Sequence, residues 1–422
     1  MKKINPLLQI WVGKYLPATH IFLKKSTVLN WTEFFGLYYK RFFIHPLKRK
    51  IAKYYLFLLK KFTDLKVIGI TGSAGKTTTK EMIKSILSLD GVTIASEKNI
   101  DPIYNIPSTI LRCRLNTKYL VLEMGIEYPG EMDFYLWMAK PDIGVITNIY
   151  PAHTEFFKNV YGIFKEKSKL AEKLGRKDTI VLNCEDKLLI RLKNKLKAKV
   201  ICFGKGGDVS SFQEKFIRTE KTAFILIFDR NYKNRIRVEI PIVGLHFVEN
   251  ALAAASVAKS LGISLENIKN GLQSYKPPEH RMSIVELKSG TILVDDSYNN
   301  NPMAAKKTLK SFVLIMGKKK KIVVFGDMLE LGSLEERYHR ELGSYISQNE
   351  FGINLLICVG NASKLTAQEA IKSMGKDKVY YFKDRQSAFL LLKNQLKPNT
   401  AILVKGSRMV GLDKLILQLL DF

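Results

Sequence analysis

The stretch VIGITGSAGKTTTKEM, residues 67–82, decides the fold class. It starts as an apolar run typical of a buried strand, turns through Gly-x-x-Gly-Lys-Thr at residues 72–77, and continues as a Thr- and Lys-rich run typical of a helix. The two glycines let backbone N–H groups point at phosphate oxygens, and the helix adds the positive end of its dipole. Strand, glycine turn and helix in this order predict a loop that binds a nucleoside triphosphate.

Two side chains of this loop have predicted chemical tasks. Lys76 is expected to bring a cation to the β- and γ-phosphates, and the Thr77 hydroxyl is expected to ligate Mg²⁺. Position 70, where the strict pattern has glycine, is Ile70, so context supports the match more than the pattern does. The predicted ligands are ATP and Mg²⁺, and the predicted nucleotide contacts in the loop are Gly72, Ser73, Ala74, Gly75, Lys76, Thr77 and Thr78.

The sequence divides into three regions. Residues 65–276 alternate strand-like and helical stretches, which predicts a P-loop parallel-sheet domain of the α/β class with helices on both faces. Within it, TAFILIFD and RIRVEIPIV lie close together and suggest an antiparallel edge. A Lys-Pro-Pro linker opens residues 277–422, whose alternating pattern predicts a second, Rossmann-like domain.

The first region, residues 1–64, is a basic helical segment by its pattern. It is rich in Lys, Arg and aromatic residues, its only acids are Glu33 and Asp64, and aromatic pairs recur at helical spacing. One interpretation is a helical cap whose aromatic face packs on the next domain. The other is an interfacial helix that lies on an anionic membrane. No nucleic-acid partner is expected, because no known motif frames the basic residues.

Bulk composition narrows the class of protein. A hydrophobic content of 46% over 422 residues excludes a disordered chain, and a net charge of +29 favours polyanionic ligands without choosing among them. Four cysteines without a C-x-x-C pair predict reduced thiols. Neither a clean signal peptide nor an apolar run long enough for a membrane span is visible. A cytoplasmic protein, peripheral to the inner face of the membrane if residues 1–64 bind lipid, is therefore expected.

Polar residues follow several predicted strands. Glu123 ends the strand-like YLVLE and is the predicted Mg²⁺ ligand, since strand ends converge at the ligand crevice of a parallel sheet. Asn148 and His153 follow the next strand, and His153 is a candidate for a second metal site. Asp295 and Asp296 suit a ribose or a metal, and equally suit a helix cap and turn.

Taken in order, these motifs resemble those of the Mur ligases, ATP-dependent amide-forming enzymes of peptidoglycan (cell-wall) precursor synthesis. The resemblance covers residues 65–422 and rests on GITGSAGKTTTKEM, LEMGIEYPGEM, ITNIYPAHTEFF, VGLHFVENALAAASVA, VDDSYNNNP, VFGDMLELG and LVKGSR. The LEMG and GDMLELG stretches favour the branch that joins D-alanyl-D-alanine to a UDP-linked muropeptide. The resemblance implies that ATP activates a carboxylate as an acyl phosphate, which an amine then attacks.

The resemblance also implies site residues. Asn250 is expected to meet adenine, and Arg281, Asp296 and Asn299 to lie near the nucleotide. Lys167 falls where many Mur ligases carry a carbamylated lysine that holds a second Mg²⁺. The residues implied to act in catalysis are Lys76, Lys167 and His153, and the implied metal ligands are Thr77, Glu123, His153 and Lys167. His339, Lys405 and Arg408 are expected to line the same cleft.

The chain departs from the family pattern at its start. The mixed α/β domain that usually holds the UDP end of the substrate is replaced by residues 1–64, and Asp101 and Pro102 stand where an asparagine pair is common. Two alternatives to the first function therefore stay open. One is a related ligase with a different acid and amine, of the cyanophycin or polyglutamate type. The other is a non-catalytic, membrane-associated nucleotide-binding scaffold.

Overall fold

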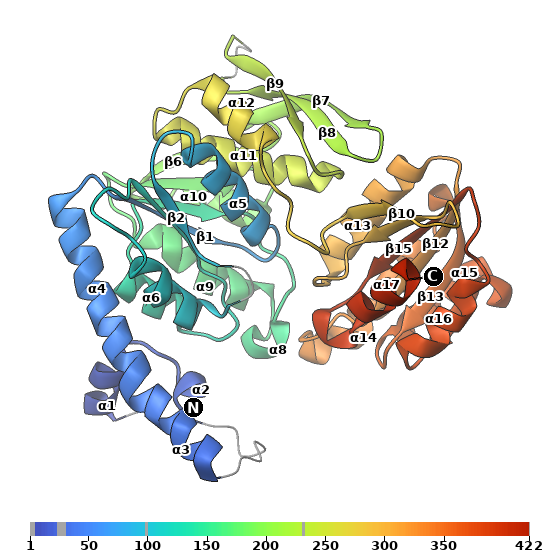
Figure 1. The fold of residues 1–422 in the computed structure, drawn as a ribbon, viewed down its shortest axis with the longest axis horizontal. Coiled ribbons are helices and arrows are strands. Elements are labelled where there is room, and N and C mark those ends of the chain that lie inside the picture. The colour runs from blue at the N-terminus through green and yellow to red at the C-terminus, as the bar shows by residue number, and fades with distance from the viewer. Residues whose placement is uncertain (1–4, 23–30, 98–99, 230–232, 422) are drawn as a thin grey trace.

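The computed structural model describes residues 5–22, 31–97, 100–229 and 233–421. Two sheet domains lie side by side, and a long helix runs along the outer flank of the first (Figure 1). The predicted α/β class is confirmed.

The central domain is built on a parallel six-stranded sheet. Its strands pair in the order β2 (Thr93–Ala95), β3 (Tyr119–Glu123), β1 (Lys66–Thr71), β4 (Ile143–Ile146), β5 (Thr179–Asn183) and β6 (Lys199–Phe203). Most of these residues are buried, because helices cover both faces of the sheet. The carboxyl ends of β1, β3 and β4 consequently lie next to one another.

Side-chain alternation along the strands creates two cores. Ile68 and Ile70 point to one face, which is covered by α5 (Lys76–Leu87), α11 (Leu245–Ser260) and α12 (Leu265–Gln273). Val67 points to the other face, which is covered by α6 (Pro102–Ile110), α7 (Glu131–Met138), α8 (Thr154–Phe157), α9 (Val160–Glu172) and α10 (Lys187–Lys193).

The predicted antiparallel edge is a separate sheet. β8 (Lys221–Ile227) and β9 (Arg235–Ile240) are antiparallel, as expected, but they pair with β7 (Ser210–Ile217) and not with the parallel sheet. This small sheet packs on α11 and α12. Its inner side chains, such as Phe224 and Val238, are buried against α11, which explains why these strands read as apolar runs.

The second domain also has a six-stranded sheet. The strand order is β10 (Ser283–Glu286), β11 (Ile292–Asp295), β15 (Thr400–Lys405), β12 (Lys320–Gly326), β13 (Ile353–Val359) and β14 (Val379–Phe382), with only β10 antiparallel. One face packs on α13 (Pro302–Met316), α14 (Glu335–Ile346) and α15 (Ser363–Met374). The other packs on α16 (Arg385–Lys393) and α17 (Leu412–Leu420).

The N-terminal segment packs as part of the central domain. It consists of α1 (Pro6–Val12), α2 (Ala18–Ile21), α3 (Trp31–Tyr39), a π-helical turn (Lys40–Ile44) and α4 (His45–Phe62). Residues 31–62 form one uninterrupted helix, which we call the N-terminal arm, and its α4 part lies against α6 (Figure 1). Ala52, Leu56 and Leu59 are buried in the same core as Val67.

Of the two interpretations of this segment, the helical cap whose aromatic face packs on the next domain is wrong in one respect. The face of α4 that meets the central domain is mainly aliphatic, and most of the large aromatic side chains point away from it. Arg49 is buried there as well, and it donates to the Val12 carbonyl oxygen at 2.9 Å. The exposed aromatic residues of the arm are Trp31, Phe34, Phe35, Tyr39, Phe43, Tyr54, Phe57 and Phe62.

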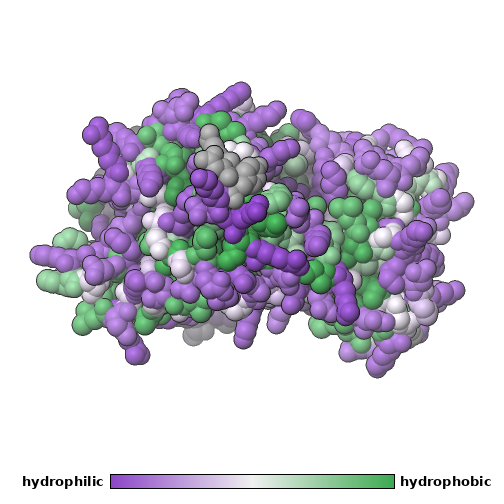
Figure 2. All heavy atoms as spheres, turned by 90° about the horizontal axis from the view of Figure 1, so that it is seen from above, coloured by the Kyte–Doolittle hydropathy of each residue, from purple (hydrophilic) through white to green (hydrophobic). Residues whose placement is uncertain are grey.

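The surface elsewhere is mixed. Seen from above, hydrophilic residues cover most of the molecule, with hydrophobic groups between them (Figure 2). Among the described residues, no helix combines the length and the apolar character needed to cross a membrane.

The shared core predicts that the arm contributes to the stability of the central domain. Leu59 is 2% exposed and its neighbour Leu58 is 48% exposed. We expect Leu59→Ala to lower the free energy of unfolding by about 2–5 kcal/mol, because it leaves a cavity. Leu58→Ala, the matched control, should cost about 0.5 kcal/mol or less. Urea unfolding followed by circular dichroism measures both, and equal losses would contradict a shared core.

Candidate active site

The phosphate-binding loop needs glycine at two positions. Gly72 and Gly75 have φ values of 147° and 80°, which side chains rarely allow. A Cβ atom at Gly72 would lie 1.9 Å from Thr147 Oγ1, and one at Gly75 would lie 2.2 Å from Asn250 Oδ1. The loop therefore sits in direct contact with the end of β4 and with α11.

Residues that follow β4 hold the loop in shape. The Ser73 N–H donates to the Asn148 carbonyl oxygen at 3.0 Å, and the Ala74 N–H donates to Asn148 Oδ1 at 2.8 Å. Thr147 Oγ1 donates to the Ala74 carbonyl oxygen at 2.6 Å. Asn148, noted in the sequence only as a residue after a strand, is thus a brace of the loop.

The helix that follows the loop carries a lysine that lines the site, Lys76, and a buried lysine behind it, Lys80. Lys76 Nζ donates to the Gly72 carbonyl oxygen at 2.9 Å, and burial lowers the pKa of its ammonium group. Lys80, one turn later, is fully buried and donates to the Ser96 carbonyl oxygen at 2.7 Å. Its Nζ lies 3.9 Å from Glu123 Oε2.

Thr77 and Glu123 form a pair suited to Mg²⁺. Thr77 Oγ1 donates to Glu123 Oε1 at 3.1 Å, so a hydroxyl and a carboxylate oxygen meet at the mouth of the loop. Ser96 Oγ accepts from the Glu123 N–H at 3.1 Å and fixes the backbone there. No group of three or more His, Cys, Asp or Glu in the described part of the chain could hold a metal by itself. Mg²⁺ usually binds through one or two carboxylates together with substrate phosphates, and this pair fits that requirement.

Lys167 lies directly behind the loop. It extends from α9, is 2% exposed, and donates to the Gly72 carbonyl oxygen at 3.1 Å. Burial, followed by the nearby charge of Lys76, holds the pKa of its amine well below the usual lysine range. The same burial and the nearby lysine disfavour the charged form of this amine.

A cavity of about 260 Å³ opens between the two domains in front of the loop. Both domains line it, which brings together residues that lie far apart in the sequence. The predicted residues that line it are Ser73, Ala74, Gly75, Lys76, Thr77, Thr78, Glu123, Asn250, Arg281, Asp296, Asn299 and Lys405. Gly72 lies just behind this lining.

Asp296 is the charged centre of the second domain's wall. Its Oδ2 accepts from Lys405 Nζ at 2.6 Å and from Thr308 Oγ1 at 2.7 Å. Burial alone would raise the pKa of Asp296, but the charge and hydrogen bonds of Lys405, with the Thr308 hydrogen bond, keep it below its ordinary value. Nearby, the Arg281 guanidinium carbon lies 4.4 Å from the centroid of the Tyr298 ring.

Asp295, predicted together with Asp296, does not line the cavity. Its Oδ2 lies 2.6 Å from His280 Nδ1, and its Oδ1 accepts from the N–H and hydroxyl of Ser297. The cap-and-turn interpretation therefore describes Asp295, while Asp296 faces the cavity. The two residues separate because neighbouring side chains at the end of a strand point to opposite faces.

Two predicted histidines lie away from the cavity. His153 precedes α8 as its N-cap residue, with φ at 57°, and its Nδ1 lies 2.5 Å from Glu330 Oε2 of the second domain. His339 is fully buried, where its Nε2 accepts from the Met328 N–H at 3.2 Å. The expectation that His339 lines the cleft is wrong, because it is a hydrogen-bonded core residue.

The segment around His153 also links the domains. Thr154 Oγ1 donates to the Leu331 carbonyl oxygen at 2.9 Å, and the Glu155 N–H donates to the Glu330 carbonyl oxygen at 3.1 Å. These bonds and the His153–Glu330 pair connect α8 to the turn after β12.

A second pocket of about 250 Å³ adjoins the first. The two pockets share Thr77, Glu123 and Tyr298, so ligands in the two pockets would meet at these residues. Arg408 lines this second pocket and not the nucleotide cavity. Its remaining lining comes from Gly125 and from the segment that contains Glu97, Ile100, Asp101, Pro102 and Asn105.

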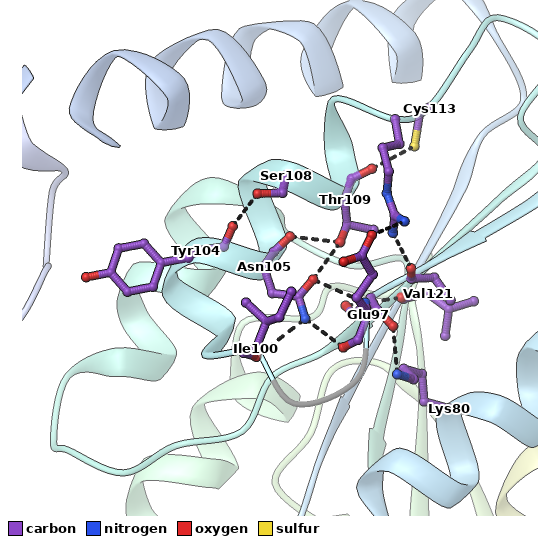
Figure 3. A network of polar contacts seen from close by, with 12 residues as sticks. Lys80, Glu97, Ile100, Tyr104, Asn105, Ser108, Thr109, Cys113 and Val121 are labelled. Atoms are coloured by element: carbon purple, nitrogen blue, oxygen red, sulfur yellow. Dashed lines mark hydrogen bonds and ion pairs between the residues drawn. The ribbon is translucent and has the colours of Figure 1, made fainter. Parts of the chain in front are cut away.

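Asn105 braces the wall of the second pocket. Its Nδ2 donates to the Glu97 carbonyl oxygen at 2.8 Å, and its Oδ1 accepts from the Glu97 N–H at 3.2 Å (Figure 3). Thr109 Oγ1 donates to the same Oδ1 at 3.0 Å. The wall is thus held by α6, the helix on which the N-terminal arm packs.

Sequence reasoning missed several residues of the nucleotide cavity. Lys307 Nζ donates to both carboxylate oxygens of Glu249, at 2.6 and 2.7 Å, and thereby ties α13 to α11. His246 also lines the cavity, and burial lowers its pKa to about 3. His246 and Asn250 are four residues apart on one helix, and this spacing could have identified His246. Lys307 follows Lys306 in a lysine-rich sequence, and no motif or spacing there distinguishes it.

Comparisons with known proteins agree with the geometry. Residues 70–258 match the Mur ligase middle domain, and residues 280–408 match the Mur ligase glutamate ligase domain. The UDP-N-acetylmuramoyl-tripeptide–D-alanyl-D-alanine ligase of Buchnera aphidicola is 33% identical over 85% of this chain and 76% of its own length. That of Bacillus subtilis is 31% identical over 88% of this chain and 79% of its own length. The crystal structure of MurF from Acinetobacter baumannii superposes with a TM-score of 0.81 at 28% identity, covering 90% of this chain and 81% of the other.

The close contact at Gly75 predicts a loss of nucleotide binding when it gains a side chain. Gly75→Ala should weaken ATP binding about 10- to 100-fold, because the Cβ meets Asn250 Oδ1 and the backbone is strained. Gly36→Ala is the control, since a Cβ there would meet nothing within 4 Å. Isothermal titration with a non-hydrolysable ATP analogue measures both affinities. Unchanged affinity in Gly75→Ala would show that the loop does not hold the nucleotide.

Proposed function

Because this chain belongs to the Mur ligase family, we propose that it is an ATP-dependent ligase that forms an amide bond in peptidoglycan precursor synthesis. The proposed reaction joins D-alanyl-D-alanine to the terminal carboxylate of a UDP-linked muramoyl tripeptide. The relatives at 33% and 31% identity carry this activity in their names.

One observation carries the proposal. The nucleotide cavity and the second pocket meet at Thr77 and Glu123, next to Lys76. Two ligands that meet at such a point are a nucleoside triphosphate, with its γ-phosphate at the junction, and an acid whose carboxylate takes that phosphate. A simple ATPase needs no second pocket there.

The first step activates the acid. A carboxylate oxygen attacks the γ-phosphorus, the bond to the β-phosphate oxygen breaks, and ADP leaves. Lys76 and the backbone N–H groups of the loop would stabilise the negative charge that spreads over the phosphoryl oxygens. Mg²⁺, held by Thr77, Glu123 and the phosphates, would supply further positive charge when bound. Arg281 and Lys405 line the same cavity as cations from the second domain.

The second step forms the amide. The amine of D-alanyl-D-alanine attacks the acyl carbon, inorganic phosphate leaves, and the amine loses a proton. Arg408 lies on the wall of the second pocket, where its guanidinium suits the carboxylate of the incoming dipeptide. The pocket's position beyond Thr77 and Glu123 supports an incoming dipeptide on the acid's side of the junction.

We further propose that Lys167 is carbamylated. Its neutral amine would attack CO₂ and lose a proton, which converts a potential cation into an anion. Lys167 and Lys76 both donate to the Gly72 carbonyl oxygen, so an anion at Lys167 would replace repulsion between two lysines by attraction. The role of His153 as a ligand of a second Mg²⁺ also stays a prediction.

The acid and amine have one specific alternative. The chemistry would be the same with a cyanophycin- or polyglutamate-type pair of substrates. A non-catalytic scaffold fits less well, because it has no use for a second pocket at the γ-phosphate.

We place the reaction in the cytoplasm. The reaction consumes ATP, and Cys113, Cys184, Cys202 and Cys358 are free thiols, as suits a reducing compartment. Residues 1–64 are the part proposed to approach the inner face of the membrane.

Phosphate release tests the ligase proposal. ATP and Mg²⁺ are supplied with UDP-muramoyl-tripeptide and D-alanyl-D-alanine, singly and together, and the products are analysed by mass spectrometry. We expect release to need both substrates and to yield the pentapeptide. Lys76→Ala should lower the rate by about 100-fold or more. If another acid–amine pair gives Lys76-dependent product while this pair gives none, the ligase chemistry stands and the substrate assignment fails.

Replacement of Lys167 tests the carbamate. Lys167→Arg keeps a cation but has no amine that forms a stable carbamate, so we expect ligation to fall about 100-fold or more. With ¹³C-labelled bicarbonate, wild-type protein should show a carbamate carbon signal by NMR, and Lys167→Arg should lack it. Lys173→Arg, a change at the end of α9, is the control and should keep both activity and signal. A wild-type spectrum without the signal would refute the carbamate whatever the activity.

A further inference from the structure

A continuous row of exposed apolar side chains runs the length of the N-terminal arm. Each of its members is between 48% and 76% exposed, although all of them are large and apolar. We call this row the exposed stripe, and it consists of Trp31, Phe35, Tyr39, Phe43, Leu47, Ile51, Tyr54, Leu58 and Phe62. An apolar surface of this extent on a single helix needs a partner.

The helix geometry keeps the stripe on one side. Successive members are four residues apart, except for one step of three between Ile51 and Tyr54. In an α-helix every four-residue step advances the direction by about 40°, so a long series of such steps would wind around the helix. The π-helical turn at Lys40–Ile44 takes more residues per turn and reverses that drift. The five members from Leu47 to Phe62 lie within an arc of about 80°.

The arm is fixed in place, so the stripe is not exposed merely because the helix is detached. Its opposite face is held by polar bonds and by burial of Leu56 and Leu59. Tyr55 donates to the Cys113 carbonyl oxygen at 2.7 Å, and Lys60 pairs with Asp142 at 2.7 Å. Figure 1 shows the α3 end of the arm extending beyond the central domain. The docked face positions the stripe outward.

The charged residues of the arm are almost all positive. Residues 31–62 contain eight Lys and Arg residues and a single acid, Glu33. Lys40 and Lys61 are exposed. An apolar stripe flanked by cations complements a surface with an apolar interior and an anionic outer layer. An anionic lipid bilayer has this arrangement, with acyl chains beneath charged headgroups.

We propose that the N-terminal arm lies on an anionic membrane, with the exposed stripe inserted among the lipid headgroups and its lysines against the phosphates. Trp, Tyr and Phe are suited to this interfacial depth, because their rings are large and, in Trp and Tyr, carry a polar atom. The arm lies on the bilayer and does not cross it, since among the described residues no helix is apolar enough to span. A second copy of the chain is disfavoured as the partner, because stripe-to-stripe contact would bring the two sets of cations together.

The test is co-sedimentation of the full-length protein with vesicles. We expect binding to vesicles that contain phosphatidylglycerol and phosphatidylcholine. The affinity for vesicles of phosphatidylcholine alone should be lower by about tenfold or more. Raising the salt concentration should weaken binding to the anionic vesicles. The triple variant Leu47→Glu, Ile51→Glu and Leu58→Glu should lose about tenfold or more in affinity, because it places three anions on the stripe.

A matched variant controls for charge and folding. Leu314→Glu, Leu390→Glu and Leu417→Glu also replace three leucines, which are between 57% and 60% exposed and lie on the second domain. The affinity of this control for anionic vesicles should stay within about twofold of wild type, because its three added negative charges lie away from the stripe. Circular dichroism and phosphate release with soluble substrates should be unchanged in both triple variants, so failure here leaves the ligase proposal standing.

Two outcomes would overturn the proposal. One is equal loss of vesicle binding in the stripe variant and the control, which would reduce the effect to net charge. The other is a concentration-dependent dimer in sedimentation velocity that the stripe variant abolishes, with no vesicle binding by the wild type. That result would assign the stripe to contact between two copies.

Discussion

Close backbone contact around the phosphate-binding loop is the constraint on which the site depends. The loop passes so near Thr147 and Asn250 that only glycine fits at residues 72 and 75. These contacts come from the end of β4, which lies beside the end of β1 in the parallel sheet, and from α11, which packs on α5. Asn148 then fixes the loop through its backbone and side chain. The loop is shaped by its neighbours before any nucleotide arrives, which reduces the cost of ordering it on binding.

The second domain supplies the wall of the cavity opposite the phosphate-binding loop. Asp296, Lys405 and Thr308 form a buried, mutually satisfied group on the opposite wall of the cavity. A buried ion pair of this kind adds little stability by itself, because desolvation offsets attraction. Its value is in placing charge at a fixed position. Together with Arg281, which lies on the same domain, it places two cations and one carboxylate on that wall of the cavity.

The sequence revealed the architecture well and the side-chain partners only partly. The phosphate loop and Glu123 could be placed because each ends a strand, and strand ends have a fixed location in a parallel sheet. Asp295 and Asp296 could not be separated, since direction at a strand end is set by the fold. His339 has a similar local context but faces the core, where Met328 and Thr366 satisfy it. The three-stranded sheet was misplaced because local pattern defines strand type and not the sheet that a strand joins. The roles of the site residues themselves stay predictions until they are measured.

The bonds between α8 and the turn after β12 bear on kinetics. His153, Thr154 and Glu155 join the central domain to Glu330 and Leu331, and the nucleotide cavity lies between the same two domains. A product enclosed by both domains escapes only when they part, and parting them strains or breaks these links. Departure of ADP and motion at the Lys-Pro-Pro hinge would then be one event. Substitutions at this remote junction would appear in an assay as changes in turnover, although none of these residues lines the nucleotide cavity.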